Sequence, residues 1–167
     1  MKTNVSFSEA DKILSSRQAG PFLHSLEEHE ENELRIVITG AKTRERAAAS
    51  GDGGDDEIWG RILSQCSQIE ADYSLAFEII FEDYIICQVR NESFCSYDPG
   101  EIRSGKFLIV FEKSKLLNYL TLSTDVCRLA DGSFYPAKWA HYGIYTQSRV
   151  IDVVSHREPK LLRLTRN

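Results

Sequence analysis

The alternation of apolar and polar positions is most regular in segment 139–155, WAHYGIYTQSRVIDVVS. Successive side chains on a strand point to opposite faces, so each half of this segment presents one full apolar face. Val, Ile, Tyr and Trp fill such pleated, half-buried surfaces well. The polar tripeptide 146–148 separates the two halves. The pattern therefore predicts a C-terminal β-hairpin, in which Asp152 is the one charged residue among positions 150–154.

Strands are also predicted at 34–39 (LRIVIT), 74–91 (SLAFEIIFEDYIICQVRN) and 107–111 (FLIVF). The last run has the composition of a strand that is buried on both faces. Glu82-Asp83 lacks the glycine of a preferred two-residue turn, so 74–91 is either a hairpin or one long bent strand. Asp98-Pro99-Gly100 is a strong turn signal. The tail after Ser155 is either an extra strand or a loose end.

Four segments are predicted to be helical. Ser8 can cap a helix within 7–18, and the acidic segment 21–32 favours a second, solvated helix. Helix 56–72 is predicted from one apolar stripe at positions i, i+4, i+8 and i+11: Ile58, Ile62, Cys66 and Ile69. Ser114 is placed to cap a fourth helix, which carries Leu116, Leu117 and Leu120.

Segment 41–56 has a different character, with charged residues, alanines and then GDGGDD. It can bury little apolar surface, so we expect a mobile loop there, either alone or on an extension of the preceding strand. No repeated β-helix-β unit carries a phosphate-binding loop, which argues against a parallel sheet. We therefore predict one α+β domain over 1–167, with a single, mostly antiparallel sheet of about six strands and helices packed on one face.

Composition excludes several classes of function. A hydrophobic fraction of 42% and a charged fraction of 27% are ordinary for a globular protein. No apolar run approaches the ~20 residues of a membrane span, and the first residues lack the apolar stretch of a secretion signal, so we expect a cytoplasmic protein. The four cysteines form no C-x-x-C pair and are expected to be free thiols. A net charge of -5 argues against nucleic acid and is compatible with a basic protein partner.

Three residues have the types needed for nucleophilic catalysis. Cys95, His141 and Asp152 can supply a nucleophile, a base and an orienting acid, and Ser93 can replace the cysteine. The competing interpretation is architectural: Asp152 hydrogen-bonds a neighbouring turn, and His141 is a structural histidine among aromatics. No nucleophile-elbow motif and no His-Glu-x-x-His zinc motif is present, so no metal and no cofactor are predicted.

A second set of residues has the composition of a protein-recognition surface, because Tyr, Trp and Arg dominate the energetics of interfaces. Its members are Arg90, Glu92, Tyr97, Tyr142 and Tyr145. Their architectural interpretation is capping and cross-strand pairing.

Three segments resemble a bacterial family of small uncharacterised proteins: RNESFCSY at 90–97, KFLIVFEKSKLLNY at 106–119, and KWAHYGIYTQSRVIDVVSHREP at 138–159. The resemblance lies in their order and spacing and covers roughly residues 74–160. It implies no reaction and no catalytic residues. Some small domains of this kind occur beside toxin genes as immunity proteins, so the resemblance implies a protein-binding role.

Three functions follow as hypotheses. The first is a cytoplasmic protein-binding module, such as an immunity-type inhibitor of a toxin. The second is a small hydrolase or transferase that uses His141 with Cys95 or Ser93. The third is a self-associating structural domain, a homodimer in which an edge strand pairs across a two-fold axis.

Overall fold

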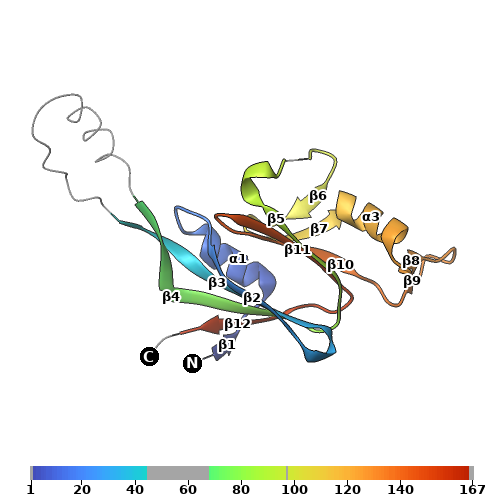
Figure 1. Ribbon diagram of the computed structural model, residues 1–167, viewed down its shortest axis with the longest axis horizontal. Helices are drawn as coiled ribbons and strands as arrows, with labels where there is room; N and C mark the ends of the chain where they lie inside the picture. Colours follow the sequence, from blue (N-terminus) through green and yellow to red (C-terminus); the bar gives the residue numbers. More distant parts are fainter. Residues whose placement is uncertain (1, 45–67, 97, 166–167) are drawn as a thin grey trace, which may run out of the picture.

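The computed structural model describes residues 2–44, 68–96 and 98–165. In this part of the chain the strands form two five-stranded sheets and one two-stranded sheet, and every strand pair is antiparallel. Figure 1 shows the two larger sheets as separate layers with helix α1 between them. No helix among these residues is long and apolar enough to cross a membrane.

Sheet A has the strand order β1 (Lys2–Asn4), β12 (Lys160–Leu164), β4 (Gln68–Phe81), β3 (Glu33–Arg44) and β2 (Phe22–His29). Sheet B has the order β5 (Tyr84–Asn91), β11 (Arg149–Ser155), β10 (Ala140–Tyr145), β7 (Leu108–Lys113) and β6 (Ile102–Ser104). The small sheet pairs β8 (Cys127–Arg128) with β9 (Phe134–Tyr135). The helical elements are α1 (Phe7–Ser15), α3 (Lys115–Ser123) and two 3-10 turns, η1 (Glu30–Asn32) and η2 (Glu92–Phe94).

The hydrophobic core lies between the two sheets. Sheet A contributes alternate residues such as Ile36 and Phe77, and sheet B contributes Ile144 and Val153, all of them fully buried. Helix α1 adds Leu14 to the same cluster. Burying such a side chain stabilises the fold by about 1.5–3 kcal/mol relative to leaving it exposed. Because the core occupies the inner faces, the outer face of sheet B is left for other groups.

The predicted single sheet with helices on one face is wrong, because the chain is mostly β and divides its strands between two sheets. Alternating hydrophobicity identifies a strand but does not say which strand it pairs with. Strands β4 and β5 are consecutive, yet β4 pairs with β3 and β12, whereas β5 pairs with β11. Segment 74–91 is therefore neither a hairpin nor one bent strand. At Glu82-Asp83, where Asp83 has a φ of 58°, the chain passes from one sheet to the other.

The acidic segment 21–32 was predicted to be a helix and is mainly strand β2. Its backbone pairs with β3 from Phe22 to His29, and this pairing outweighs the poor strand propensity of glutamate. Residues 68–72, predicted to be helical, lie in β4. Residues 41–44 lie in β3, in agreement with the alternative that the preceding strand extends into segment 41–56. The rest of both predicted segments lies outside the described residues.

Other expectations are confirmed. The C-terminal hairpin is β10–β11, strands form at 34–39 and from Leu108 onward, and the tail supplies β12. Ser114 caps α3 by accepting a hydrogen bond from the backbone N–H of Leu117 at 3.1 Å. Helix α1 forms as expected, but Ser6 rather than Ser8 caps it. The Ser6 hydroxyl accepts from the Glu9 N–H, and the Glu9 carboxylate accepts from the Ser6 N–H, so two otherwise unpaired donors are satisfied together.

A buried carboxylate on α1 holds the start of β7. Asp11 is 8% exposed, and its oxygens accept backbone N–H groups of three consecutive residues, Lys106 at 3.1 Å, Phe107 at 2.8 Å and Leu108 at 2.9 Å. Gly105 precedes this run with a φ of 98°, and a Cβ there would lie 2.1 Å from the Leu108 carbonyl oxygen. A glycine is therefore required for the turn that points the three N–H groups at Asp11.

We predict that Gly105→Ala lowers the free energy of unfolding by about 2 kcal/mol, because it combines an unfavourable φ with a backbone clash. Urea unfolding followed by circular dichroism measures the change. Gly132→Ala is the matched control, since Gly132 has a similar φ of 86° but open space around its Cβ position. Equal losses in the two variants would contradict the proposed clash at Gly105.

Candidate functional site

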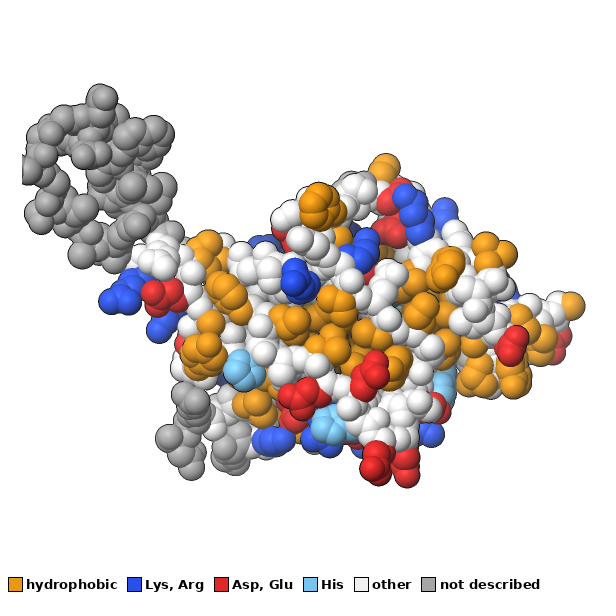
Figure 2. Space-filling model, in the orientation of Figure 1, with side chains coloured by type: hydrophobic (Ala, Val, Ile, Leu, Met, Phe, Trp, Pro, Cys, Tyr) orange, Lys and Arg blue, Asp and Glu red, His pale blue; other side chains and the backbone are white. Residues whose placement is uncertain are grey.

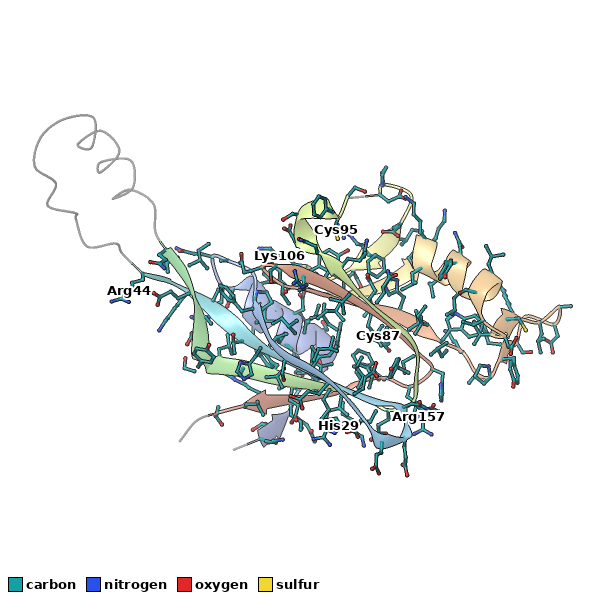
Figure 3. The ribbon with its side chains drawn as sticks, in the orientation of Figure 1. His29, Arg44, Cys87, Cys95, Lys106 and Arg157 are labelled. Carbon is teal, nitrogen blue, oxygen red and sulfur yellow. The ribbon has the colours of Figure 1, made fainter. Side chains whose placement is uncertain are left out.

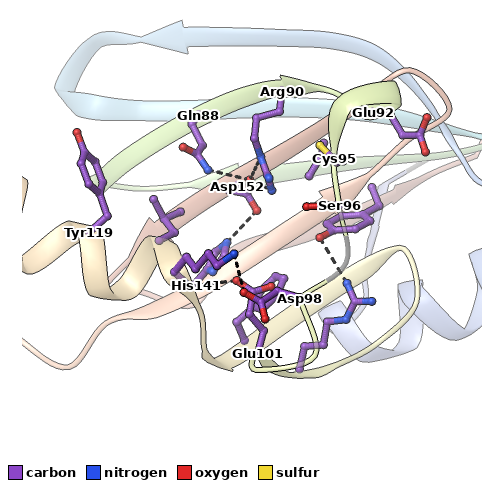
Figure 4. A pocket seen from close by; sticks show the side chains of 16 residues that line it. Gln88, Arg90, Glu92, Cys95, Ser96, Asp98, Glu101, Tyr119, His141 and Asp152 are labelled. Carbon is purple, nitrogen blue, oxygen red and sulfur yellow. Dashed lines mark hydrogen bonds and ion pairs between the residues drawn. The ribbon is translucent and has the colours of Figure 1, made fainter.

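A pocket of about 340 Å³ lies on the outer face of sheet B. Its floor is made of side chains that point away from the core, including Asp152 of β11 and His141 of β10. One wall is the first part of α3, and the other is formed by residues from 92–96 and 98–103, between η2 and β6. Figure 4 shows Gln88 and Arg90 across the pocket from Asp98 and Glu101. The volume is at the lower end of the range for ligand pockets, which suits a small molecule or one side chain.

Asp152 is the centre of a buried polar network. It is 0% exposed, and its Oδ2 accepts from Arg90 Nε at 3.0 Å, from Arg90 Nη2 at 2.7 Å and from Gln88 Nε2 at 3.1 Å. Its Oδ1 lies 2.9 Å from His141 Nε2. The partners of Asp152 are therefore side chains on the neighbouring strands β5 and β10, rather than the turn that the sequence suggested. Hydrogen bonds from this many partners offset the free-energy cost of burying the carboxylate.

Contacts on both ring nitrogens fix the orientation of His141. An ionised carboxylate only accepts hydrogen bonds, so Nε2 carries the proton that it donates to Asp152. Nδ1 lies 2.8 Å from Ser114 Oγ, which accepts the Leu117 N–H. The imidazole is 3% exposed and stacks on the Phe111 ring at 4.1 Å between centroids. A continuous chain of hydrogen bonds thus joins the N-terminus of α3 to Arg90.

The pKa of Asp152 is lowered from its ordinary value. Burial raises this pKa because it penalises the charged form. The hydrogen bond from His141, the charges of His141 and Arg90, and the hydrogen bond from Gln88 lower the pKa and together outweigh burial. Asp152 is therefore an ionised, structural carboxylate at neutral pH.

The structure brings the three catalytic candidates to one pocket, since Cys95, His141 and Asp152 all line it. However, both ring nitrogens of His141 are already engaged, so neither is available to take a proton from Cys95. The Cys95 thiol instead lies 3.4 Å from the carbonyl oxygen of Asn91. Ser93 is absent from the pocket lining, and its backbone N–H donates to the Asn91 side chain.

The hydroxyl that contacts His141 belongs to Ser114, which sequence reasoning identified only as a helix cap. Ser114, His141 and Asp152 have the residue types of a hydrolase triad, but Ser114 is 2% exposed and does not line the pocket. Its oxygen already accepts the Leu117 N–H and lies 2.8 Å from His141 Nδ1. A substrate would have no access to this oxygen, so the arrangement supports architecture over nucleophilic attack.

The five recognition candidates are placed differently. Arg90, Glu92 and Tyr145 line the pocket. Tyr142 points to the opposite face of β10, is 7% exposed, and packs in the core between sheets A and B. Alternation along a strand puts neighbouring residues on opposite faces, and only the fold shows which face is the core. Tyr97 lies outside the described residues.

Sequence reasoning missed the two carboxylates on the 98–101 turn, Asp98 and Glu101, and considered Lys115 only as part of a polar rim or as a capping residue. Lys115 Nζ lies 2.7 Å from Asp98 Oδ2, and Glu101 Oε1 accepts the Lys115 backbone N–H at 3.0 Å. The Lys115 ammonium and the Gly100 N–H lower the pKa of Asp98, and Asp98 in turn raises the pKa of Lys115. The Asp-Pro-Gly turn signal indicated the backbone shape but gave no sign that these side chains would face a pocket.

Exposed apolar side chains lie on the elements that build the pocket walls, and one of them, Tyr119, lines the pocket itself. We define the rim as four residues on the elements that build the pocket walls: Phe94 (88% exposed), Ile102 (53%), Tyr119 (54%) and Leu122 (85%). Figure 2 shows apolar side chains interspersed with charged ones over this part of the molecule. Isolated exposed apolar residues are ordinary, whereas a group of them around a pocket is typical of an interaction site.

Among the described residues, Cys87, Cys95 and Cys127 are free thiols, as predicted, and Figure 3 shows Cys87 and Cys95 well apart. Burial raises the pKa of Cys87 to about 11. In the same ranges no group of three or more His, Cys, Asp or Glu residues is arranged to hold a metal ion. Cys66 lies outside them.

Comparison of the chain with protein-family models, with curated proteins and with solved structures found no match. The likeness to the family of small bacterial proteins therefore stays a prediction that rests on the three quoted segments.

Proposed function

We propose that the chain is a protein-binding module, of the kind that immunity-type inhibitors of toxins represent, and that it binds its partner through the pocket and rim of sheet B. The observation that carries this proposal is the group of exposed apolar side chains on the elements that build the walls of a pocket, whose buried polar groups already satisfy one another. A protein partner would cover the rim and remove that apolar surface from water.

The same network makes a hydrolase or transferase the weaker alternative. A general base needs a free lone pair within hydrogen-bond reach of the nucleophile, and His141 has committed both nitrogens. A network that joins β5, β10, β11 and α3 instead supports the role of a rigid platform for recognition, since preorganised surfaces lose less entropy on binding. The free thiols of the described cysteines support a location in the reducing cytoplasm.

We predict that Phe94→Ala and Leu122→Ala each weaken binding of the partner at least about tenfold, since truncating a buried hot-spot side chain costs 2 kcal/mol or more. The chain is coexpressed with the product of the adjacent gene, and the complex is isolated by size-exclusion chromatography. Calorimetry then measures the dissociation constant of each variant. Both residues are highly exposed, so the variants are expected to fold normally.

Ile69→Ala and Tyr73→Ala serve as controls, because these residues are also exposed and apolar but lie on β4 of sheet A. A loss of binding in the β4 variants with no loss in the rim variants would place the interface elsewhere and refute the proposal. Light scattering of the purified chain gives a monomer mass if the rim meets a foreign partner. A dimer mass that the rim variants abolish would favour self-association instead.

A further inference from the structure

The positive features of the pocket that an anion would use are already occupied. The Nε and Nη2 groups of Arg90 are bound by Asp152. At the N-terminus of α3, the Lys115 N–H donates to Glu101 and the Leu117 N–H donates to Ser114. A helix N-terminus attracts anions through such N–H groups, and here the carboxylate of Glu101 already holds that position. An external phosphate or carboxylate would have to displace these internal groups.

The carboxylate of Asp98, on the acidic side of the pocket, has a partner that is easier to displace than the partners of Arg90. Asp98 Oδ2 is paired with the ammonium of Lys115, whose side chain is 77% exposed. Exposed ion pairs contribute little to stability, so another cation can replace this ammonium readily. Asp98 Oδ1 accepts the Gly100 N–H at 2.8 Å, so the carboxylate keeps its orientation when Lys115 moves away. Glu101 adds a second carboxylate to the same side of the pocket (Figure 4).

The lining also suits a planar cation. Asp98 and Glu101 lie beside each other in the pocket lining (Figure 4), and a planar guanidinium group can pair with such carboxylates through several N–H groups at once. The chain already holds one guanidinium against a ring in this pocket, since the guanidinium carbon of Arg103 lies 5.8 Å from the centre of the Tyr145 ring. A lysine ammonium would lack the planar match.

We propose that the pocket takes an arginine side chain of the partner protein, and that its guanidinium replaces the Lys115 ammonium at Asp98. The inference rests on the proposed function and deepens it by naming the chemistry of the partner. A basic partner also complements the net charge of -5. In this arrangement the Lys115 ammonium and the arginine of the partner compete for the same carboxylate, that of Asp98.

The test uses a titration of the isotope-labelled full chain with N-acetyl-arginine-methylamide, followed by NMR. We expect saturable shifts at residues 98–103. We expect Lys115→Ala to tighten binding at least threefold, because the competitor is gone. Asp98→Asn should weaken binding at least tenfold, while its remaining amide oxygen still accepts the Gly100 N–H. Lys138→Ala and Glu112→Gln, both exposed and absent from the pocket lining, should change nothing.

The direction in which Lys115→Ala changes the affinity for the arginine probe tests whether Lys115 competes with the arginine. Weaker binding in that variant, shifts caused by inorganic phosphate instead of the arginine probe, or no saturable shift with the probe would each overturn the inference. The lysine analogue, N-acetyl-lysine-methylamide, should bind more weakly than the arginine probe, and equal binding would contradict the planar match. If Phe94→Ala abolishes partner binding while Asp98→Asn leaves it unchanged, the proposed function stands and the arginine inference fails.

Discussion

Asp152→Ala is expected to lower the free energy of unfolding by about 3 kcal/mol, the low end of the cost of breaking a buried ion pair. The substitution leaves the Nε2–H of the buried His141 without an acceptor and removes the counter-ion of Arg90. Arg90 is 43% exposed and can turn toward water, which keeps the cost below the upper limit. Urea unfolding at pH 7 measures the change, and Asp125→Ala, at an exposed acid, is the control.

The pH dependence of this loss gives a second check. The folded-state pKa of Asp152 is lowered, so the carboxylate contributes its full stability above the unfolded-state pKa of about 4. That contribution decreases as the pH falls below this value and is lost once the pH passes the folded-state pKa. The difference between wild type and Asp152→Ala should therefore shrink steadily as the pH falls below 4. A difference that stays constant down to pH 2 would show that the carboxylate does not act through its charge.

Asp11→Ala is expected to lower the free energy of unfolding by about 2–3 kcal/mol, because a charged acceptor is removed from three backbone donors. The Leu108 N–H is buried, so water replaces the lost hydrogen bond poorly. Amide hydrogen exchange measures the local effect. The N–H groups of residues 106–108 should exchange faster in the variant, while those of the β3–β4 pair should follow the global stability.

Asp11→Asn provides the matched control. One amide oxygen can still accept from Phe107 and Leu108, whereas the Lys106 N–H loses the carboxylate oxygen that lies nearest to it. We therefore expect a smaller loss than in Asp11→Ala. An Asp11→Ala variant as stable as wild type would mean that these hydrogen bonds contribute no net stability, and that apolar packing alone holds α1 against β7.

Part of the pocket could be read from the sequence. Alternation in segment 139–155 placed His141 and Asp152 on their strands, and Ser114 was identified as a helix cap. The sequence did not reveal that these three residues meet, because β7, β10 and β11 must first pair side by side. Likewise, nothing in the sequence around Asp11 indicates its role. Residues 106–108 lie almost a hundred positions further along the chain, and only the fold brings their N–H groups within reach of its oxygens.

The sequence located the two described helices and six of the described strands, β3, β4, β5, β7, β10 and β11, because period-two alternation and capping residues are local properties. It did not determine that the strands divide into two sheets, or that the acidic segment 22–29 forms a strand, because backbone pairing depends on partners distant in the chain. The tertiary structure alone decided which face of β10 is core and which face is pocket. Both faces of a buried strand carry apolar residues, so the sequence pattern does not distinguish the core face of β10. The packing of α1 and sheet A against one face makes that face the core.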